Sequence, residues 1–260
     1  MAGFPNKEYP ILEYDPERRA IIEPSVSAKA SRVKPPDRCV MCFFQEVLRK
    51  LRRKGRIRRV FDLKSELGRN PVFIMRHAGK RLAVLHAGLG GPLSGGWLDQ
   101  MIGWGVRKFV VAGGAGVLDG DIPPGTVIVP RSAVRDEGTS YHYMPPGREA
   151  KPGKRAFAAV LKTLKASGVP WRVGKTWTTD AFYRETRAKI ERRRREGCLT
   201  VEMEAASMFA VARFRGAELA IILYGGDDVS GKVWDRRGVW TRWGARERLF
   251  RLAVEACSRM

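Results

Sequence analysis

The sequence has no long apolar run and only four cysteines among its 260 residues. A membrane-spanning helix needs about 20 consecutive apolar residues, and a small disulfide-stapled scaffold needs a much higher density of cysteine. The N-terminus also lacks a basic start followed by an apolar block, so the sequence predicts no secretory signal. Together these absences favour a soluble globular protein, which we expect to be cytoplasmic.

Potential metal ligands are scarce as well. His77, His86 and His142 are isolated from one another, and Cys39 and Cys42 form the only close cysteine pair. A structural zinc site needs four ligands at characteristic spacings, and no second pair completes such a set. We predict no metal and no organic cofactor, and we interpret both cysteines as core residues. A redox dithiol is the alternative.

Acidic residues are few relative to basic ones. The chain has 27 Asp and Glu against 49 Lys and Arg, which gives a net charge of +22. Such a charge alone favours a nucleic-acid partner. However, the basic runs at 49–56 and 192–195 fall on expected helices without the interleaved aromatics of a single-strand binding surface. We therefore interpret them as a solvated, arginine-rich surface and do not predict nucleic-acid binding.

Short apolar strands alternate with helical patterns along most of the chain, which is typical of an α/β domain with parallel strands. Two of the strands run into glycine clusters, at 88–91 and 113–116, where we expect turns that gather backbone N–H groups. We expect a single domain over 1–260, with proline-rich residues 1–36 as an extended arm that has at most a short strand at 20–22. The expected strands are 39–44, 81–87, 108–112, 126–129, 171–178 and 219–224, and the expected helices are 45–54, 92–104, 154–167, 187–196, 204–215 and 245–257.

Residues 201–206, with the sequence VEMEAA, carry the strongest indication of chemistry. Glu204 stands where a helix begins, so we expect the positive end of the helix dipole to keep it ionised and oriented. A fixed carboxylate can accept one hydrogen bond on each oxygen from two neighbouring hydroxyls, as a ribose diol would require. The alternative is a helix N-terminus that merely favours acidic residues.

Three segments in the same order together resemble the nucleoside phosphorylase family, which includes purine nucleoside phosphorylase, uridine phosphorylase and methylthioadenosine nucleosidase. They are residues 87–92 (AGLGGP), 178–183 (TTDAFY) and 201–206. The resemblance, which runs from about Arg81 to the C-terminus, implies a three-layer fold with a central mixed, mostly parallel sheet flanked by helices. It also implies a pentosyltransferase-type enzyme that cleaves the N-glycosidic bond of a purine or uridine nucleoside with phosphate. The products would be a free base and ribose 1-phosphate.

The resemblance assigns roles to individual residues. Glu204 would hold the ribose hydroxyls, Met203 would pack on the sugar, and Asp227 would activate the departing base. An Asp at this position favours a purine, whereas the segment 135–142 is similar to uridine phosphorylases, so the base stays open. Ordinary core packing for the aromatics and a simple strand end for Asp227 are the structural alternatives. The implied substrate-binding residues are Glu202, Met203, Glu204, Phe182, Tyr183 and Thr179.

The phosphate site matches the family least. The early Gly-Asp-Pro-x-Arg turn is absent, with 35–38 (PPDR) as a remnant, and Val111 stands where the family has arginine. A missing guanidinium removes a contact worth about 2–3 kcal/mol. The remaining candidates for phosphate binding are Gly88, Gly114, Arg69, which would act on a neighbouring subunit, and Arg135. Hydrolysis by water is therefore the first alternative, and a non-catalytic nucleotide- or nucleic-acid-binding protein is the second.

The family resemblance further implies a homo-oligomer. Sites in this family lie across dimer interfaces, often within hexamers, so we expect an assembly built from dimers. The implied partners are a nucleoside and inorganic phosphate as co-substrate, with no membrane.

Overall fold

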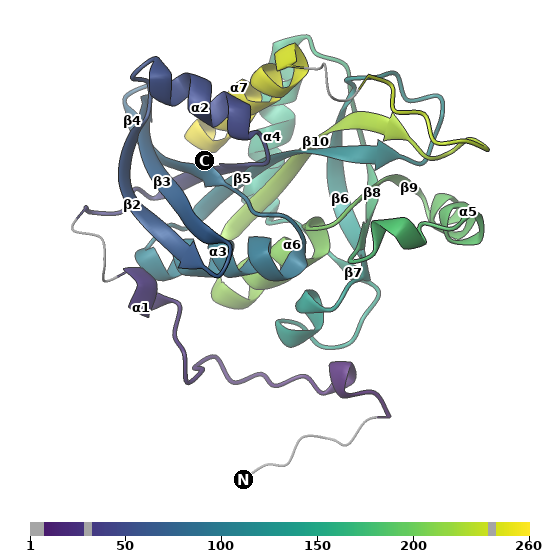
Figure 1. Cartoon of the computed structure of the whole chain (residues 1–260), viewed down its shortest axis with the longest axis horizontal. Coiled ribbons are helices and arrows are strands. Elements are labelled where there is room, and N and C mark those ends of the chain that lie inside the picture. Colours follow the sequence, from purple (N-terminus) through teal and green to yellow (C-terminus); the bar gives the residue numbers. More distant parts are fainter. Residues whose placement is uncertain (1–7, 29–32, 239–242) are drawn as a thin grey trace.

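The computed structural model describes residues 8–28, 33–238 and 243–260, which fold around one ten-stranded mixed sheet (Figure 1). The strands are β1 (Arg38–Cys42), β2 (Arg58–Ser65), β3 (Gly68–His77), β4 (Lys80–His86), β5 (Lys108–Val117), β6 (Val127–Asp136), β7 (Glu149–Ala150), β8 (Trp171–Thr179), β9 (Cys198–Glu202) and β10 (Glu218–Asp228). The α-helices are α1 (Ser25–Ala28), α2 (Gln45–Arg53), α3 (Gly91–Trp104), α4 (Lys154–Ser167), α5 (Arg187–Arg195), α6 (Ala205–Arg215) and α7 (Trp243–Arg259). Short 3₁₀ turns are η1 (Pro10–Leu12), η2 (Thr139–His142) and η3 (Phe182–Arg184).

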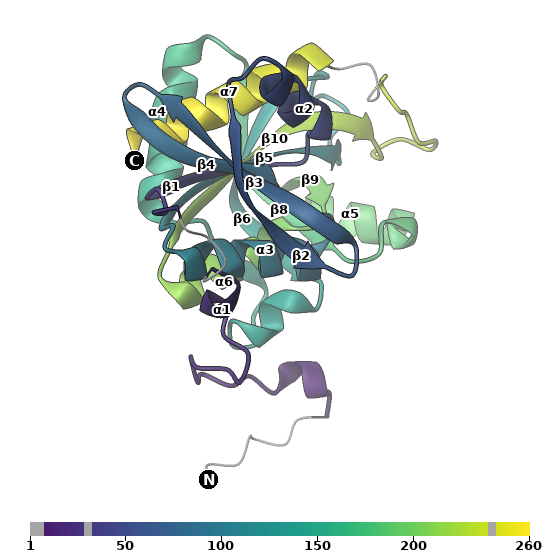
Figure 2. The same cartoon turned by 60° about the vertical axis from the view of Figure 1, so that its left-hand side comes forward.

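Helices cover both faces of the sheet, which gives the three layers that the family resemblance implies. α2, α4 and α7 lie on one face, and α3 and α6 lie on the other (Figures 1 and 2). Alternate side chains of β1 enter the two resulting cores, because successive residues of a strand point to opposite faces. Cys39 packs toward α3 and α6, and Cys42 packs toward α2 and α7. The prediction that both cysteines are core residues is confirmed, and the redox dithiol is excluded.

Parallel pairing brings several strand ends to one edge of the sheet. β1 pairs in parallel with β4 and β5, and β5 pairs in parallel with β10. β9 then joins the end of β5 through an antiparallel pairing of Gly116 with Val201. Antiparallel pairs also attach β2, β3, β6 and β7, so the sheet is mixed as expected. The segments that follow the parallel strands therefore meet in one place.

Three expected strand ends are wrong, because β5, β6 and β10 continue, the last of them to Asp228 instead of ending at Tyr224. The glycines at 113–116 lie inside β5 and make no turn. A Cβ on Gly114 would lie 2.9 Å from the Tyr224 ring, and one on Gly116 would lie 3.1 Å from the Val201 side chain. These glycines therefore allow close packing of neighbouring strands. Likewise, Pro130 does not close β6, because it falls at a register shift where the missing N–H is tolerated.

The first eighty residues differ most from expectation. β2 and β3 form an antiparallel hairpin at 58–77, which lacks a clear alternation because most of its side chains are at least partly exposed. The expected strand at 20–22 is absent, and Ile21 and Ile22 are exposed. The described part of the arm packs on its own domain: α1 lies against α3, and Arg215 on α6 donates a hydrogen bond to the Arg18 carbonyl at 3.0 Å.

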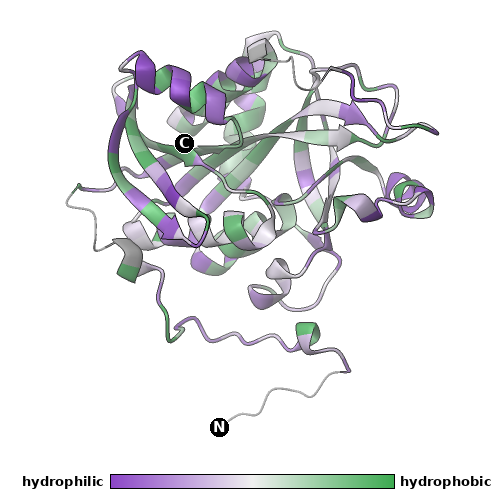
Figure 3. Cartoon of the chain, in the orientation of Figure 1, coloured by the Kyte–Doolittle hydropathy of each residue, from purple (hydrophilic) through white to green (hydrophobic). Residues whose placement is uncertain are grey.

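The basic runs lie on α2 and α5, where Figure 3 shows hydrophilic residues on the outer surface. Arg193 is the exception, since it is 7% exposed and its guanidinium stacks on Trp177 and binds Asp136 at 3.2 Å. Within the described ranges, no helix combines the length and apolar character needed to span a bilayer.

Candidate active site

A pocket of about 450 Å³ lies where β1, β5, β9 and β10 end, and we call it the strand-end pocket. Parallel α/β sheets commonly bind ligands at this edge. Six of the residues predicted from the sequence line it: Gly114, Phe182, Glu202, Met203, Glu204 and Asp227. The remaining lining residues are Phe43, Phe44, Leu89, Ala115, Gly116, Glu185, Val201, Tyr224, Gly226, Trp234 and Arg246.

Glu204 stands immediately before α6 and is 7% exposed. Its carboxylate accepts hydrogen bonds from the backbone N–H of Gly90 at 2.7 Å and of Met203 at 3.3 Å. Burial, followed by the negative charge of Glu202, raises the pKa of Glu204. Desolvation and the charge of Glu202 therefore oppose the helix dipole that we expect to favour the ionised form of Glu204. Hydroxyl donors from a ligand would supply the stabilisation that this carboxylate lacks.

Glu202 is held by the protein itself. Its carboxylate accepts hydrogen bonds from the backbone N–H of Glu204 at 2.7 Å and of Ala205 at 2.6 Å, and from the Thr178 hydroxyl at 2.6 Å. Thr178 in turn accepts a hydrogen bond from the N–H of Ala206 at 2.9 Å. These contacts satisfy the otherwise free N–H groups at the start of α6. Glu202 thereby fixes the backbone that carries Glu204.

The two adjacent aromatic residues, Phe182 and Tyr183, lie in different surroundings. Phe182 lines the pocket and is 48% exposed, whereas Tyr183 is 88% exposed and lies outside it. Their ring centroids are 4.1 Å apart. Thr179 is buried and also lies outside the lining, and its hydroxyl accepts a hydrogen bond from the N–H of Ala181 at 3.3 Å. Thr179 thus shapes the turn that presents Phe182.

Asp227 and its neighbour Asp228 have different surroundings. Asp227 lines the pocket and accepts a hydrogen bond from the Trp234 indole at 2.7 Å. Asp228 forms an ion pair with Arg237 and accepts the N–H of Ser230 at 2.7 Å, and these contacts hold its pKa below the usual value although burial opposes them. The two adjacent aspartates therefore have separate partners, and of the two only Asp227 lines the pocket.

Of the four predicted phosphate-binding residues, only Gly114 lines the pocket. The N–H of Gly88 donates to His86 at 3.1 Å. Arg135 is 5% exposed, and its guanidinium donates to the Ser140 hydroxyl at 2.7 Å and to two carbonyls of the following loop. Arg69 lies on the exposed β2–β3 hairpin, 3.5 Å from Asp62. The segment 35–38 leads into the first residue of β1 and lies at the opposite end of that strand from the pocket.

Sequence reasoning missed Glu185, Trp234 and Arg246. Arg246, on α7, is the only Lys or Arg that lines the pocket within the described ranges. Its guanidinium donates to Glu46 at 3.0 Å and to the Tyr224 hydroxyl at 3.2 Å. No local pattern distinguishes Arg246 from the other 48 basic residues, because its place in the pocket depends on how α7 returns to the sheet.

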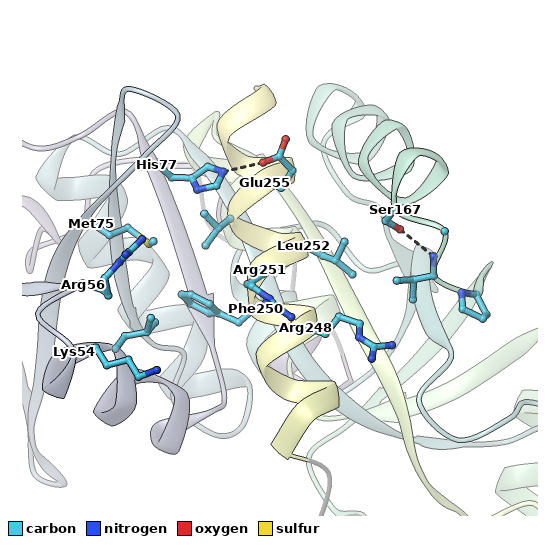
Figure 4. Close-up of a pocket in the computed structure, with 15 residues that line it drawn as sticks. Lys54, Arg56, Met75, His77, Ser167, Arg248, Phe250, Arg251, Leu252 and Glu255 are labelled. Carbon is cyan, nitrogen blue, oxygen red and sulfur yellow. Dashed lines mark hydrogen bonds and ion pairs between the residues drawn. The ribbon is translucent and has the colours of Figure 1, made fainter.

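A second hollow of about 930 Å³, which we call the helix groove, lies along α7, with α2 and β3 on one side and the end of α4 on the other (Figure 4). Its floor is apolar, and its charged side chains include Lys54, Arg56, Arg248 and Arg251. Glu255 in the groove binds His77 at 2.8 Å. None of the predicted site residues lines this groove. Among the residues that the structure describes, no cluster of three or more His, Cys, Asp or Glu could hold a metal ion.

Comparison with known proteins agrees with this geometry. The model of the phosphorylase superfamily matches residues 37–257. A guanosine phosphorylase from Halorubrum lacusprofundi is 30% identical over 184 residues, which are 68% of this chain and 76% of that protein. A DeoD-type purine nucleoside phosphorylase from Shewanella amazonensis is 26% identical over 175 residues, or 66% of this chain and 72% of that protein.

The fold also has a solved counterpart. The crystal structure of a uridine phosphorylase from Vibrio fischeri superposes with a TM-score of 0.75 at 20% identity, and the match covers 92% of this chain and 99% of that one. This likeness confirms the expected α/β architecture. With the family match over most of its length, the chain belongs to the phosphorylase superfamily.

Proposed function

We propose that this chain is a nucleoside phosphorylase, which cleaves the N-glycosidic bond of a nucleoside with phosphate to give a free base and ribose 1-phosphate. Superfamily membership and relatives named as guanosine and purine nucleoside phosphorylases support this activity. The observation that carries the proposal is Glu204, a carboxylate almost buried in the strand-end pocket beside Met203 and held by the backbone N–H groups of Gly90 and Met203.

The pocket residues supply the three elements that the reaction needs. Glu204 would accept hydrogen bonds from the ribose hydroxyls, with Met203 packed on the sugar. Phe182 would stack on the base from the mouth of the pocket. As the sugar gains positive character in the transition state, the carboxylates around it stabilise that charge, which is the part of binding that accelerates the reaction.

Asp227 would interact with the departing base. The Trp234 indole binds one of its oxygens, Oδ2, and from this carboxyl group a purine ring nitrogen would receive a hydrogen bond or a proton. An acid at this position, together with the names of the relatives, favours a purine over uridine as substrate.

The direct test is an assay for free base. The protein is incubated with guanosine, inosine, adenosine and uridine, with and without inorganic phosphate, and base and ribose 1-phosphate are separated by chromatography. We expect base release that requires phosphate and is fastest with a purine nucleoside. No release from any nucleoside under either condition would contradict the proposal.

Hydrolysis is a second candidate because the pocket offers an anion few contacts. Arg246 is the single described cation of the lining, and Glu46 already binds its guanidinium at 3.0 Å. Phe43 and Phe44 occupy the segment directly after β1. In this case water attacks the sugar, and base release in the assay above is independent of phosphate.

We further propose a homo-oligomer in which Arg69 contacts a neighbouring subunit. Its side chain is 69% exposed and lies on a hairpin that extends from the edge of the sheet. Light scattering coupled to size exclusion would give the mass of the assembly. If Arg69 holds phosphate in trans, Arg69→Gln raises the KM for phosphate without changing that mass.

A further inference from the structure

We propose that Glu185 and Asp227 act together as one acid, which holds a single proton and delivers it to the departing base. Glu185 lies outside the sequence motifs that indicated the site. The inference rests on the proposed nucleoside cleavage, because it assigns the source of a proton within that reaction. Glu185 is a positioning residue in this scheme, since it acts through its partner.

Two separate elements bring these carboxylates to one pocket. Glu185 follows η3, and its backbone N–H donates to the Phe182 carbonyl at 3.2 Å, which ties it to the turn that carries the stacking ring. Asp227 enters from the end of β10, beside Gly116 of β5. Both line the strand-end pocket. The acid pair is therefore adjacent to the place expected for the base.

The two carboxylates differ in their hydrogen bonds. Asp227 accepts a hydrogen bond from Trp234 at 2.7 Å, which stabilises negative charge on it. Within the described residues, no side-chain donor is bound to the Glu185 carboxylate. Burial and then the charge of Asp227 raise the pKa of Glu185 to about 7. One proton on the pair near neutral pH is the state that this environment favours.

Other charged groups around the pocket do not replace this interaction. Glu202 is bound to backbone N–H groups of α6, and Arg246 is bound by Glu46. Glu204 is bound to Gly90. From the helix that follows η3, Arg187 donates to the Gly231 carbonyl at 3.2 Å. Among the charged groups that the structure describes, Asp227 is the one that raises the pKa of Glu185, after burial.

The chemical step balances with one proton. The bond between the anomeric carbon and the base nitrogen breaks, and its electron pair goes to the base. The proton of the acid pair goes to a ring nitrogen of the base, and an oxygen of phosphate forms the new bond to the anomeric carbon. The pair is left with both carboxylates ionised and regains its proton from solvent. An acid that titrates near the working pH is suited to such a transfer.

Glu185→Gln tests the pair through the pH dependence of base release. The substitution removes the carboxyl group whose pKa is raised to about 7, so we expect the falling limb of the pH profile to move down by at least about one unit. We expect turnover at pH 7.5 to fall about tenfold or more, while Glu185→Asp retains part of it. Glu191→Gln, at an exposed position of α5, is the matched control and should keep the wild-type profile. An unchanged profile in Glu185→Gln would overturn the inference.

A titration without substrate separates this inference from the proposed function. With glutamate side chains labelled with ¹³C at the carboxyl carbon, NMR should show a signal that titrates near pH 7, disappears in Glu185→Gln and moves to lower pH in Asp227→Asn. Titration of Glu185 at the ordinary value in a protein that releases base refutes the inference alone. Coupled titration in a protein that cleaves no nucleoside refutes the proposed function and, with it, delivery of the proton.

Discussion

The strand-end pocket and the helix groove have opposite charge, although they belong to one strongly basic chain. The pocket has four carboxylates, from Glu185, Glu202, Glu204 and Asp227, and one described cation. The groove is about twice as large, and four of its side chains are basic (Figure 4). With 49 basic and 27 acidic residues, a basic groove is what composition alone would produce. An acidic pocket runs against composition, so its charge is the more informative feature.

The comparison also shows that the larger of the two hollows is not the one whose residues indicate a function. Two of the four carboxylates, Glu202 and Glu204, are buried, and the protein itself binds Glu202. A buried carboxylate costs free energy unless something binds it, so Glu204 at the wall of an acidic pocket indicates a ligand with hydroxyl or N–H donors. The groove has no comparable cost, because its cationic heads can stay in water while their stems cover the apolar floor. The comparison therefore predicts that substitutions in the pocket change catalysis and that equivalent substitutions in the groove do not.

The largest expected effect is that of Glu204→Gln in the strand-end pocket, and Glu255→Gln in the helix groove is its matched control. Glu204→Gln removes a charged acceptor for the ribose, and each such hydrogen bond contributes about 1.5–3 kcal/mol. We expect kcat/KM for nucleoside cleavage to fall by about 100-fold or more, with an unchanged far-ultraviolet circular dichroism spectrum. Glu255→Gln in the groove breaks only the pairs with His77 and Arg259 and should leave kcat/KM within about twofold. Equal effects would remove the distinction between the two regions.

Asp227→Asn should have the next largest effect. Loss of proton donation to a leaving group costs about 100-fold in kcat. The loss should be greater for purine nucleosides than for uridine, because the pyrimidine has no ring nitrogen at the equivalent place. Asp228→Asn, one residue further along β10, provides the comparison for stability, since it breaks the pair with Arg237. Steady-state kinetics with both substrates would reveal whether the preference exists.

Phe182→Ala should act mainly on binding. Removal of one stacked ring costs about 0.5–1.5 kcal/mol beyond the lost area, so we expect the KM for the nucleoside to rise about five- to tenfold with a smaller change in kcat. Tyr183→Ala is the control, because this neighbouring ring is exposed outside the pocket. If Tyr183→Ala raises KM as much as Phe182→Ala does, the base lies further out than we propose.

Glu185→Gln should have a smaller effect, which we expect in the pH dependence of the free energy of unfolding. Burial and Asp227 raise its pKa from 4.5 to about 7, so its stabilising contribution is fully present below about pH 4.5 and is lost as pH rises through about 7. The wild-type free energy of unfolding should therefore decline from pH 5 to 8 more steeply than that of Glu185→Gln. Urea unfolding at several pH values measures both slopes. Parallel slopes would mean that Glu185 titrates normally.

The smallest effect is expected in the helix groove. Replacing Arg248 and Arg251 by Gln removes two cations at exposed positions, so catalysis should stay within about twofold. The same variant probes the nucleic-acid alternative through binding of single-stranded RNA at low and moderate salt. Salt-sensitive binding that the variant loses would show that the groove has a function of its own.

Most of the fold was predictable because hydrophobic periodicity is local. α4 has the predicted bounds, and the bounds of α2, α3, α5 and α6 each differ from the prediction by one residue at one end. The hairpin of β2 and β3 was missed because its partly exposed strands show no alternation. The extensions of β5 and β6 were missed because glycine and proline usually end strands, and only neighbouring strands explain why these do not.

The site was predictable where short motifs specify it. Glu204, Met203 and Phe182 were predicted within contiguous segments, and all three line the pocket. Glu185 and Arg246 reach it through tertiary packing, which no spacing along the chain encodes. Arg135 illustrates the opposite case. The polar segment that contains it suggested anion binding, but its guanidinium donates hydrogen bonds to two carbonyls of the following loop.

The indole of Trp234 has a practical consequence. It is 53% exposed and shares its hydrogen bond with Asp227, the carboxylate that a base would approach. Any molecule that competes for that carboxylate alters the polarity around the ring and therefore its fluorescence. Trp234 can therefore serve as an intrinsic fluorescence probe of ligand binding. The difference between wild type and Trp234→Phe would give the contribution of Trp234 to the emission of the seven tryptophans.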